Sequence, residues 1–164
     1  MKKKPNILFI FPDQQRGDSL GCMGHPVVQT PNLDKIAEQG VTFTRCYTNS
    51  PLCVPARAAM QTGQYVSQNG AWNNRLVLDP DSPSYVRNIR DAGYHTAIIG
   101  KTHLWTHGIG GVTDNHTDQK KQVLEEWGFQ DIHELTGPMA SSGHDSPYTD
   151  YLKERDSLFA YRKY

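Results

Sequence analysis

Hydrophobic and polar positions along this chain switch between the period of a strand and the period of a helix. Residues 6–11 carry a continuous apolar run with β-branched and aromatic side chains, which predicts a first strand buried on both faces. Residues 41–48 alternate and predict a second strand. The run "HTAIIGK", residues 95–101, predicts the next buried strand.

The segment "TPNLDKIAEQG", residues 30–40, carries the start and stop signals of a helix. We expect Thr30 to be the N-cap, Pro31 to occupy the first helical position and Gly40 to end the helix. The apolar residues of this segment recur at helical spacing and are expected to share one face: Leu33, Ile36 and Ala37.

Two more helices are predicted between the second strand and the third. The first covers about residues 55–62 and ends at Gly63. The second lies within residues 81–93, where a Ser-Pro opening and a Gly stop recur and Val86 and Ile89 face inward. The order strand, helix, strand, helix, helix, strand favours an α/β fold, a layered domain with a mainly parallel sheet.

Composition and charge narrow the range of partners. The chain has 164 residues, enough for one domain, although its apolar fraction of 37% is low for that length. Its 17 basic residues balance its 17 acidic residues, so the sequence lacks the electrostatic footprint of a protein that binds nucleic acid or a membrane surface. No stretch reaches membrane-spanning length. We expect a single folding unit whose specificity comes from a local site.

The cysteines and the first residues bear on the cellular compartment. Cys22, Cys46 and Cys53 are an odd number and lack the spacing of a disulfide framework or a zinc site, which favours free thiols in a reducing compartment. The chain begins with basic residues, but the apolar run 7–11 is too short for the core of a signal peptide. We therefore expect a cytoplasmic protein.

Polar residues follow two of the predicted strands, at the sheet edge where α/β proteins bind ligands. Asp13 and Gln14 come after the first strand and offer the oxygen ligands that Ca²⁺ or Mg²⁺ prefers. Lys101 and His103 come after the third, and alternate residues of an extended segment share a side. Both pairs are therefore candidates for one site.

A third candidate lies at the start of the predicted second helix. If Pro55 occupies the first helical position, Cys53 lies just ahead of the helix and Arg57 lies in its first turn, so both can face one pocket. A cysteine is usually a small core residue, and each of the other signals is also common alone. Combined with Lys101 and His103, they describe a site for a tetrahedral anion.

These residues resemble the type I sulfatases of the alkaline phosphatase superfamily. The similarity runs from "PNILFIFPDQ" through "SPLCVPARAAMQTGQY" and "DAGYHTAIIGKTHL", and more weakly through "EEWGFQDIHEL" to "SPYTDYLKERD". The Cys-x-Pro-x-Arg signature, a following Thr-Gly-x-Tyr element and a Gly-Lys-x-His element carry it. The resemblance implies an alkaline phosphatase-like α/β/α fold, of which residues 1–164 are the N-terminal part of the catalytic domain.

The resemblance also implies a chemistry for the cysteine. In this family the signature cysteine is converted by a formylglycine-generating or equivalent maturating enzyme to formylglycine, whose hydrate has two hydroxyl groups. One hydroxyl attacks the sulfur of a sulfate ester and expels the alcohol. Deprotonation of the other hydroxyl then collapses the sulfated hemiacetal back to the aldehyde, which releases the sulfate. Cys53 is then a precursor of the nucleophile, and the expected substrate is a small-molecule sulfate ester.

Residue roles follow by position in the family motifs. The expected metal is most often Ca²⁺, with Mg²⁺ or Mn²⁺ as alternatives, and its expected ligands are Asp13, Gln14 and the modified Cys53. Arg57 would hold the hydrate in its ionised form, and Lys101 would bind a sulfate oxygen. His103 would hydrogen-bond the hydrate and act as its base.

Two departures from the family keep alternatives open. Many sulfatases have a second aspartate where this chain has Gln14, whose amide brings no negative charge and should hold a cation less tightly. Some phosphonate monoester and phosphodiester hydrolases of the superfamily lack that aspartate too. Family members are also several hundred residues long, so an inactive fragment or a pseudoenzyme is a further alternative.

The rest of the chain adds weaker expectations. Nothing after His103 reads as a strand-end Asp-His or Asp-Asn motif, and the remaining histidines stand in loop-like contexts: His107, His116, His133 and His144. The loop "GAWNNRLVLDPDS" could line a pocket through Trp72, Asn73 and Asn74, or simply lie in solvent. A last helix opens at "SPYTDYLKER", and an exposed apolar edge would favour homo-oligomers.

Overall fold

The computed structural model describes residues 4–104 and 118–163 and divides into two compact units. The first unit is Met1–Tyr47 and the second is Thr48–Tyr164. The sequence had indicated one folding unit.

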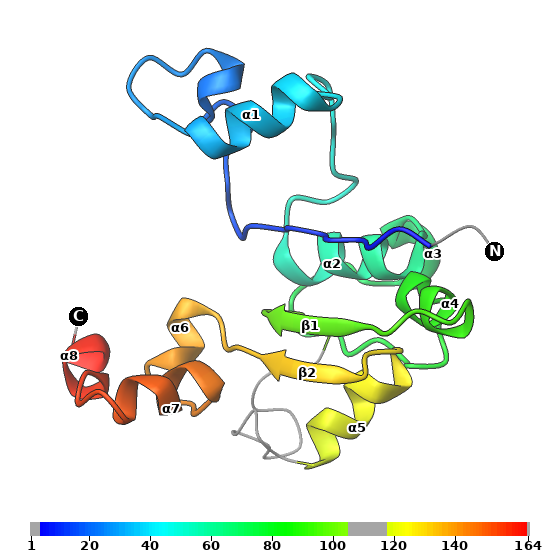
Figure 1. Ribbon diagram of the computed structural model, residues 1–164. Coiled ribbons are helices and arrows are strands. Elements are labelled where there is room, and N and C mark those ends of the chain that lie inside the picture. The colour runs from blue at the N-terminus through cyan, green and yellow to red at the C-terminus, as the bar shows by residue number, and fades with distance from the viewer. Residues whose placement is uncertain (1–3, 105–117, 164) are drawn as a thin grey trace. The chain divides into compact units, whose positions relative to one another are not determined.

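The first unit consists of a short 3-10 helix, η1 (Gly21–Met23), and the helix α1 (Pro31–Gln39), joined by a loop (Figure 1). The predicted bounds of α1 are confirmed, with Thr30 as the N-cap position, Pro31 as the first helical residue and Gly40 at the end. Proline suits this position because the N–H groups of the first turn have no partner within the helix.

Asp34 joins η1 to α1. Its Oδ1 accepts hydrogen bonds from the N–H of Cys22 and the hydroxyl of Thr30, each at 2.8 Å. The Thr30 hydroxyl in turn accepts a hydrogen bond from the N–H of Gly21 at 2.8 Å. Thr30 therefore ties the loop to the helix and makes no side-chain cap of α1.

Both strands predicted for the first 48 residues are wrong. Residues 6–11 and 41–48 have no strand structure, and Leu8 and Phe43 are 85% and 78% exposed. A strand buried on both faces needs neighbours beside it and layers above and below it. Among the described residues only β1 and β2 pair, and neither of the two segments is part of that sheet.

The second unit contains the remaining elements (Figure 1). Its helices are α2 (Cys53–Thr62), α3 (Val66–Asn69), α4 (Tyr85–Asp91), α5 (Asp118–Glu126), α6 (Pro138–Ser141), α7 (Pro147–Lys153) and α8 (Leu158–Lys163). Its strands are β1 (Ala97–Gly100) and β2 (Asp131–Glu134). The predicted helices at α4 and α7 are confirmed, and each begins after a serine N-cap, Ser84 or Ser146.

The sheet is parallel, as the sequence predicted, and pairs β1 with β2. Its register places Ala97 opposite Asp131 and Gly100 opposite Glu134, and α5 lies in the crossover between the strands. β1 is less buried than predicted, because alternate residues face solvent and Ile99 is 79% exposed. The shared carboxyl end of the two strands leads directly into the residues of the candidate site.

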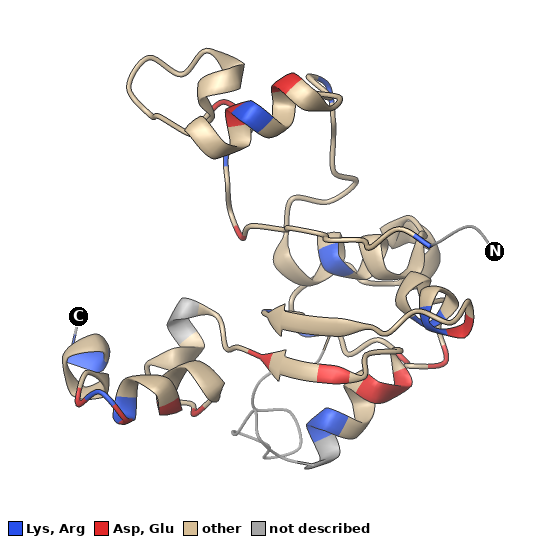
Figure 2. Cartoon of the chain, in the orientation of Figure 1, with Lys and Arg blue, Asp and Glu red and all other residues tan. Residues whose placement is uncertain are grey.

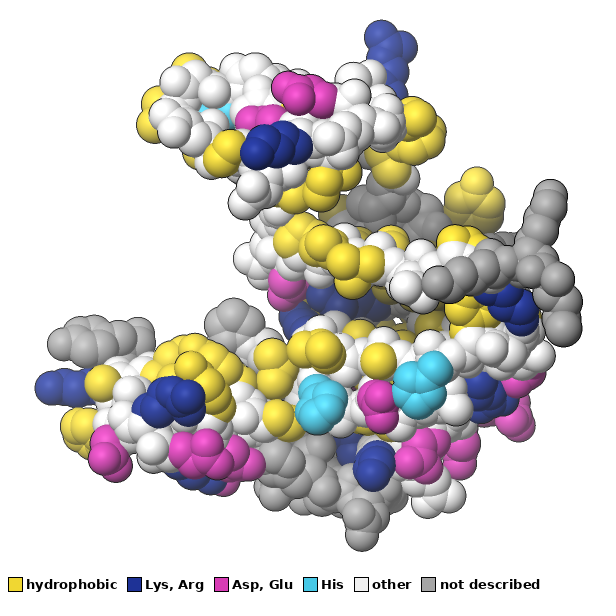
Figure 3. Space-filling model, in the orientation of Figure 1, with side chains coloured by type: hydrophobic (Ala, Val, Ile, Leu, Met, Phe, Trp, Pro, Cys, Tyr) yellow, Lys and Arg dark blue, Asp and Glu magenta, His cyan; other side chains and the backbone are white. Residues whose placement is uncertain are grey.

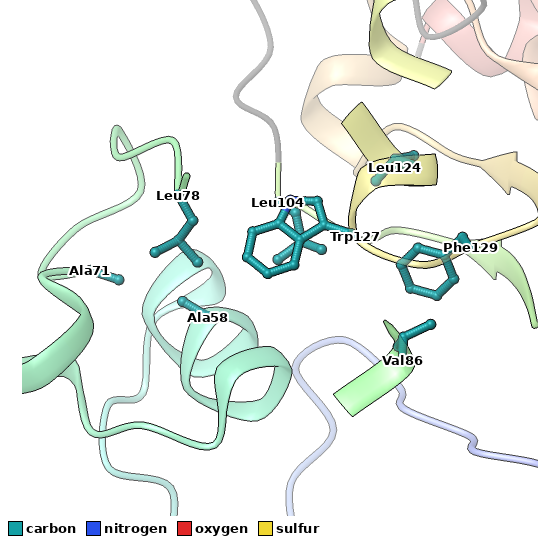
Figure 4. Close-up of a cluster of buried hydrophobic side chains, with 8 residues drawn as sticks. All are labelled: Ala58, Ala71, Leu78, Val86, Leu104, Leu124, Trp127 and Phe129. Atoms are coloured by element: carbon teal, nitrogen blue, oxygen red, sulfur yellow. The ribbon is translucent and has the colours of Figure 1, made fainter. Parts of the chain in front are cut away.

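The core of this unit packs α2, α4 and α5 against the sheet (Figure 4). Its buried members are Ala58, Ala71, Leu78, Val86, Leu104, Leu124, Trp127 and Phe129. Leu104 belongs to the loop that follows β1, so this loop is anchored in the core. The expected inward position of Val86 is confirmed, and Ile89 is half-buried.

One buried serine links three helices of this unit. Ser84, which is 3% exposed, caps α4 by accepting from the N–H of Arg87 at 3.1 Å. The same hydroxyl donates to the carbonyl oxygen of Trp127 at 2.7 Å and accepts from the amide of Gln61 at 2.8 Å. α2, α4 and the end of α5 are therefore held in a fixed arrangement around the core.

Candidate active site

α2 begins two residues earlier than the sequence predicted. Cys53 is its first residue, and Leu52 is the extended N-cap with φ −115° and ψ 152°. Pro55 therefore occupies the third helical position instead of the first. The first turn tolerates a proline there, because its missing N–H would have had no partner within the helix.

Cys53 and Arg57 lie one turn apart on α2, so their side chains are neighbours on one helix face. Cys53 is a free thiol and half-buried, and Arg57 is only 5% exposed. Arg57 donates a hydrogen bond from Nη1 to the backbone carbonyl oxygen of Lys101. The structure thus joins the cysteine segment to the loop after β1, as the sequence predicted for these two motifs.

The start of α2 is also held by the loop before α4. The N–H of Val54 donates to Oδ1 of Asn74 at 3.0 Å. Asn74 therefore satisfies one of the N–H groups that a first turn leaves open. Trp72, Asn73 and Asn74 are exposed, which agrees with the solvent-facing alternative for these residues, whereas Ala71 and Leu78 of the same loop are buried in the core. The sequence did not indicate the structural role of Asn74.

The loop after β1 alternates as expected. Lys101 and His103 are half-buried, whereas Thr102 and Leu104 are 6% and 4% exposed. His103 has a left-handed backbone with φ 53°. Non-glycine residues are uncommon in this region and occur there often at functional sites.

Lys101 lies against the turn that precedes α6. A methyl group built on Gly137 would be 3.3 Å from the Lys101 ammonium nitrogen and 3.5 Å from Cε. The absence of a side chain at Gly137 therefore leaves the room that the end of Lys101 occupies. Gly137 has an ordinary extended backbone, with φ −66° and ψ 164°, which any residue can adopt. Its structural role is therefore to leave space for Lys101, and it does not depend on the conformational freedom of glycine.

Thr102, between the two candidate residues, is held by Glu134 at the end of β2. Oε1 of Glu134 accepts from the N–H of Thr102 at 3.2 Å and also from its hydroxyl. Oε2 of Glu134 lies 3.1 Å from the ammonium of Lys120 on α5, and both side chains of this ion pair are almost completely buried. None of these interactions was predicted from the sequence.

The candidate metal ligands Asp13 and Gln14 belong to the first unit. The other candidate site residues belong to the second unit: Cys53, Arg57, Lys101 and His103. Both are exposed, and Gln14 has a left-handed backbone with φ 59°. Within residues 4–104 and 118–163, no group of three or more His, Cys, Asp or Glu side chains could hold a metal ion. Asp13 and Gln14 remain predicted metal ligands.

The remaining histidines include one on the sheet. His133 lies on β2 and not in a loop, which corrects the expectation for it. It is exposed near a pair formed by His95 Nε2 and Asp131 Oδ2, 2.7 Å apart, and Figure 3 shows histidine and acidic side chains together over the sheet. The hydrogen bond from His95 lowers the pKa of the Asp131 carboxyl. His107 and His116 lie outside the described residues.

Comparison with known proteins establishes the family. The family model described as Sulfatase matches residues 5–160. The chain belongs to the sulfatase family. An ulvan-active sulfatase of Formosa agariphila is 34% identical over 148 residues, which are 90% of this chain and 28% of that protein.

Two solved structures agree with the family. A structure titled as a complex with its substrate D-glucosamine-2-N,6-O-disulfate is 37% identical, with a TM-score of 0.61 over 64% of this chain and 21% of the other. The phosphonate monoester hydrolase of Agrobacterium radiobacter is 30% identical, with a TM-score of 0.70 over 93% of this chain and 29% of the other. The alkaline phosphatase-like fold class predicted from the sequence is thereby confirmed.

The sulfatase chain described here spans less than a third of the length of these relatives. Its described helices include none that is both long enough and apolar enough to cross a membrane.

Proposed function

We propose that the protein is a sulfuric ester hydrolase that acts through a formylglycine derived from Cys53, together with a divalent metal. The observation that carries this proposal is the link from Cys53 through Arg57 to Lys101. It places a cation one helical turn from the cysteine and ties that cation to the loop that carries Lys101 and His103. Membership of the sulfatase family supports sulfate as the anion.

The surroundings of Cys53 fit the modification. The residue is a free thiol in the first turn of α2, a helix of 10 residues, where N–H groups and the helix dipole favour negative charge. Formylglycine, when formed there, supplies a hydrated aldehyde whose oxygen is the nucleophile. Arg57 stabilises the negative charge of that oxygen. A formylglycine-generating or equivalent maturating enzyme is the partner that this chemistry requires.

Lys101 and His103 complete the proposed site. Lys101 binds an oxygen of the sulfate group and compensates the charge that develops on it during transfer. His103 accepts a proton from the hydroxyl group of the nucleophile that remains after attack. The carbonyl of Lys101 is fixed by Arg57 and the backbone of Thr102 is fixed by Glu134, so both side chains start from a defined loop.

The donor chemistry of Asp13 and Gln14 fits a hard cation. A carboxylate and an amide oxygen suit Ca²⁺, and also Mg²⁺ or Mn²⁺. Ca²⁺ takes about six to eight oxygen ligands, so these two residues and the modified Cys53 supply only part of a coordination sphere. The metal would neutralise charge at the nucleophile.

A second candidate function is hydrolysis of a phosphonate monoester or a phosphodiester. The similarity to a phosphonate monoester hydrolase covers 93% of this chain, and this observation supports the second candidate function. A cluster of one Arg, one Lys and one His binds either tetrahedral anion. Matched aryl esters of sulfate, phenylphosphonate and phosphate diester distinguish the two, and a kcat/KM at least tenfold higher for the sulfate ester is expected.

The test of the main proposal uses the intact protein produced together with a maturating enzyme. We expect the mass of the peptide that contains residue 53 to correspond to formylglycine. Cys53→Ala should lower the hydrolysis of an aryl sulfate by about a thousandfold or more. Cys46→Ala removes an exposed free cysteine and is the matched control, which should retain full activity.

Other outcomes would overturn this proposal. An unmodified cysteine in the co-produced protein, or a wild-type protein that hydrolyses none of the esters, would support the pseudoenzyme. Equal activity of the Cys53→Ala and Cys46→Ala variants would show that the nucleophile lies elsewhere.

A further inference from the structure

Glu134 ends β2 at the position that pairs with Gly100, directly before Lys101. The N–H of Leu135 donates to the carbonyl oxygen of Gly100 at 3.0 Å, so the ladder is closed up to the last residue of each strand. The register of the sheet therefore carries the Glu134 side chain to the start of the loop with Lys101 and His103. Figure 2 shows acidic positions on β2 and basic positions on α5.

Both carboxylate oxygens of Glu134 are engaged. Oε1 accepts from the N–H and from the hydroxyl of Thr102, and Oε2 pairs with the Lys120 ammonium at 3.1 Å. A further hydrogen bond runs from the N–H of Leu104 to the Thr102 hydroxyl at 3.4 Å. Thr102 is thus fixed through its backbone and its side chain at once.

We propose that Glu134 is a positioning residue that sets the directions of Lys101 and His103 by holding Thr102 between them. The inference rests on the proposed function, because it concerns the same site. Burial alternates along this loop, with Thr102 and Leu104 buried and Lys101 and His103 half-buried. Holding the Thr102 side chain in the interior therefore keeps its two neighbours at the half-buried edge of the loop, and His103 keeps its left-handed backbone only while this loop is held.

Lys120 allows the carboxylate of Glu134 to lie near a site for an anionic substrate. A buried carboxylate without a partner would repel a sulfate group and would be costly to keep ionised. The Lys120 ammonium neutralises it in a place where both side chains are almost completely buried. Glu134 therefore contributes orientation to the loop without adding net negative charge beside it.

The test compares three substitutions in the intact, matured protein: Thr102→Val, Thr102→Ser and Glu134→Gln. Valine keeps the shape of threonine and leaves the Glu134–Lys120 ion pair in place, but it removes the hydroxyl. Serine keeps the hydroxyl. We expect Thr102→Val and Glu134→Gln to lower kcat by about 10–100-fold, as substitutions behind active-site residues commonly do, and Thr102→Ser to stay within about threefold of wild type.

Two readouts separate positioning from a merely structural role. The pH dependence of kcat should change in Thr102→Val, because His103 acts as the base, and thermal unfolding should remain cooperative. The Thr102→Val/Glu134→Gln double variant should be no slower than the slower single variant, because both act through one contact. If Glu134→Gln fails to fold, the Val and Ser variants decide the outcome.

The failure of this inference is distinguishable from the failure of the proposed function. Full wild-type activity with unchanged kcat and an unchanged pH profile in Thr102→Val would overturn the role of Glu134 and leave the function standing. A matured wild-type protein without sulfatase activity would overturn the proposed function itself, and with it this inference.

Discussion

The guanidinium group of Arg57 donates a hydrogen bond to the backbone carbonyl oxygen of Lys101 and so connects the first turns of α2 with the end of β1. Arg57 is 5% exposed and lies one helical turn after Cys53. Its charge is therefore held in place by the backbone of the same loop that supplies Lys101. This link makes a direct prediction about substitution of the arginine.

Arg57→Lys should lower kcat/KM for an aryl sulfate by about a hundredfold or more, because a lysine cannot reproduce the fixed planar donor group of an arginine. Steady-state kinetics of the matured protein measure this loss. Arg90→Lys is the matched control, since Arg90 bonds to Asp91 beside it on the surface of α4. A similar loss in both variants would contradict a specific role for Arg57.

Gly137→Ala should impair substrate binding through Lys101. The added methyl group would lie 3.3 Å from the Lys101 ammonium nitrogen, so the end of that side chain must move by a few tenths of an ångström. We expect KM for a sulfate ester to rise by about two- to tenfold with little change in stability. Gly143→Ala, where no heavy atom lies within 4 Å of the added methyl group, should leave KM unchanged.

Gly128→Ala should destabilise the second unit. Gly128 has φ +108°, and a methyl group there would lie 2.6 Å from the Arg87 nitrogen and 2.7 Å from its Cα, both backbone atoms of α4. We expect a loss of about 3 kcal/mol or more in the free energy of unfolding. Gly70→Ala, with φ +72° and open space around it, isolates the backbone effect and should cost about 1 kcal/mol. Equal losses in denaturant unfolding would rule out the steric explanation.

Stability near the C-terminal helices should fall in acid through Asp145. Its carboxylate lies 2.8 Å from the Lys153 ammonium and 2.7 Å from the Arg162 guanidinium. The hydrogen bond from Lys153, and after it that from Arg162, lowers the pKa of Asp145 below its ordinary value of 3.8. A lowered pKa in the folded state means that the stabilisation is complete above 3.8 and is lost as the pH falls below it.

Asp145→Asn should therefore be less stable than wild type at pH values above 3.8, and the two stability curves should converge below it. Both partners are partly exposed, so the expected difference is small, a few tenths of a kcal/mol. Chemical unfolding across a pH series measures it. A constant difference at all pH values would show that the carboxylate charge is not involved.

The helices of this protein were predictable because their signals are local. Thr30 with Pro31, the Ser84 N-cap and the Ser146 N-cap each stand within one turn of the helix that they begin. The start of α2 was misplaced because a proline fits any position of the first turn, and the prediction assigned Pro55 to the first one.

The strands were less predictable because a strand depends on partners elsewhere in the chain. The apolar run 6–11 has strand composition yet forms no strand pair among the described residues, whereas β2, with the sequence DIHE, has only Ile132 as an apolar residue and does pair. Arg57 and Lys101 were expected at the site because each stands in a local motif. Glu134 was not expected, because its place at the site depends on strand pairing. Its contact with Thr102 arises from the register of a strand that the pattern did not reveal.

The contact between Thr102 and Glu134 joins residues that are 32 positions apart in the sequence. A contact between residues so far apart in the sequence forms only after the crossover between them has closed. The entropy lost in closing that loop must be overcome before the contact stabilises the fold. α2 and α4 can begin from local turns, but the loop with Lys101 and His103 gains its anchor only when the parallel strands meet. The anion-binding loop is therefore expected to form late in folding, after the helices around it.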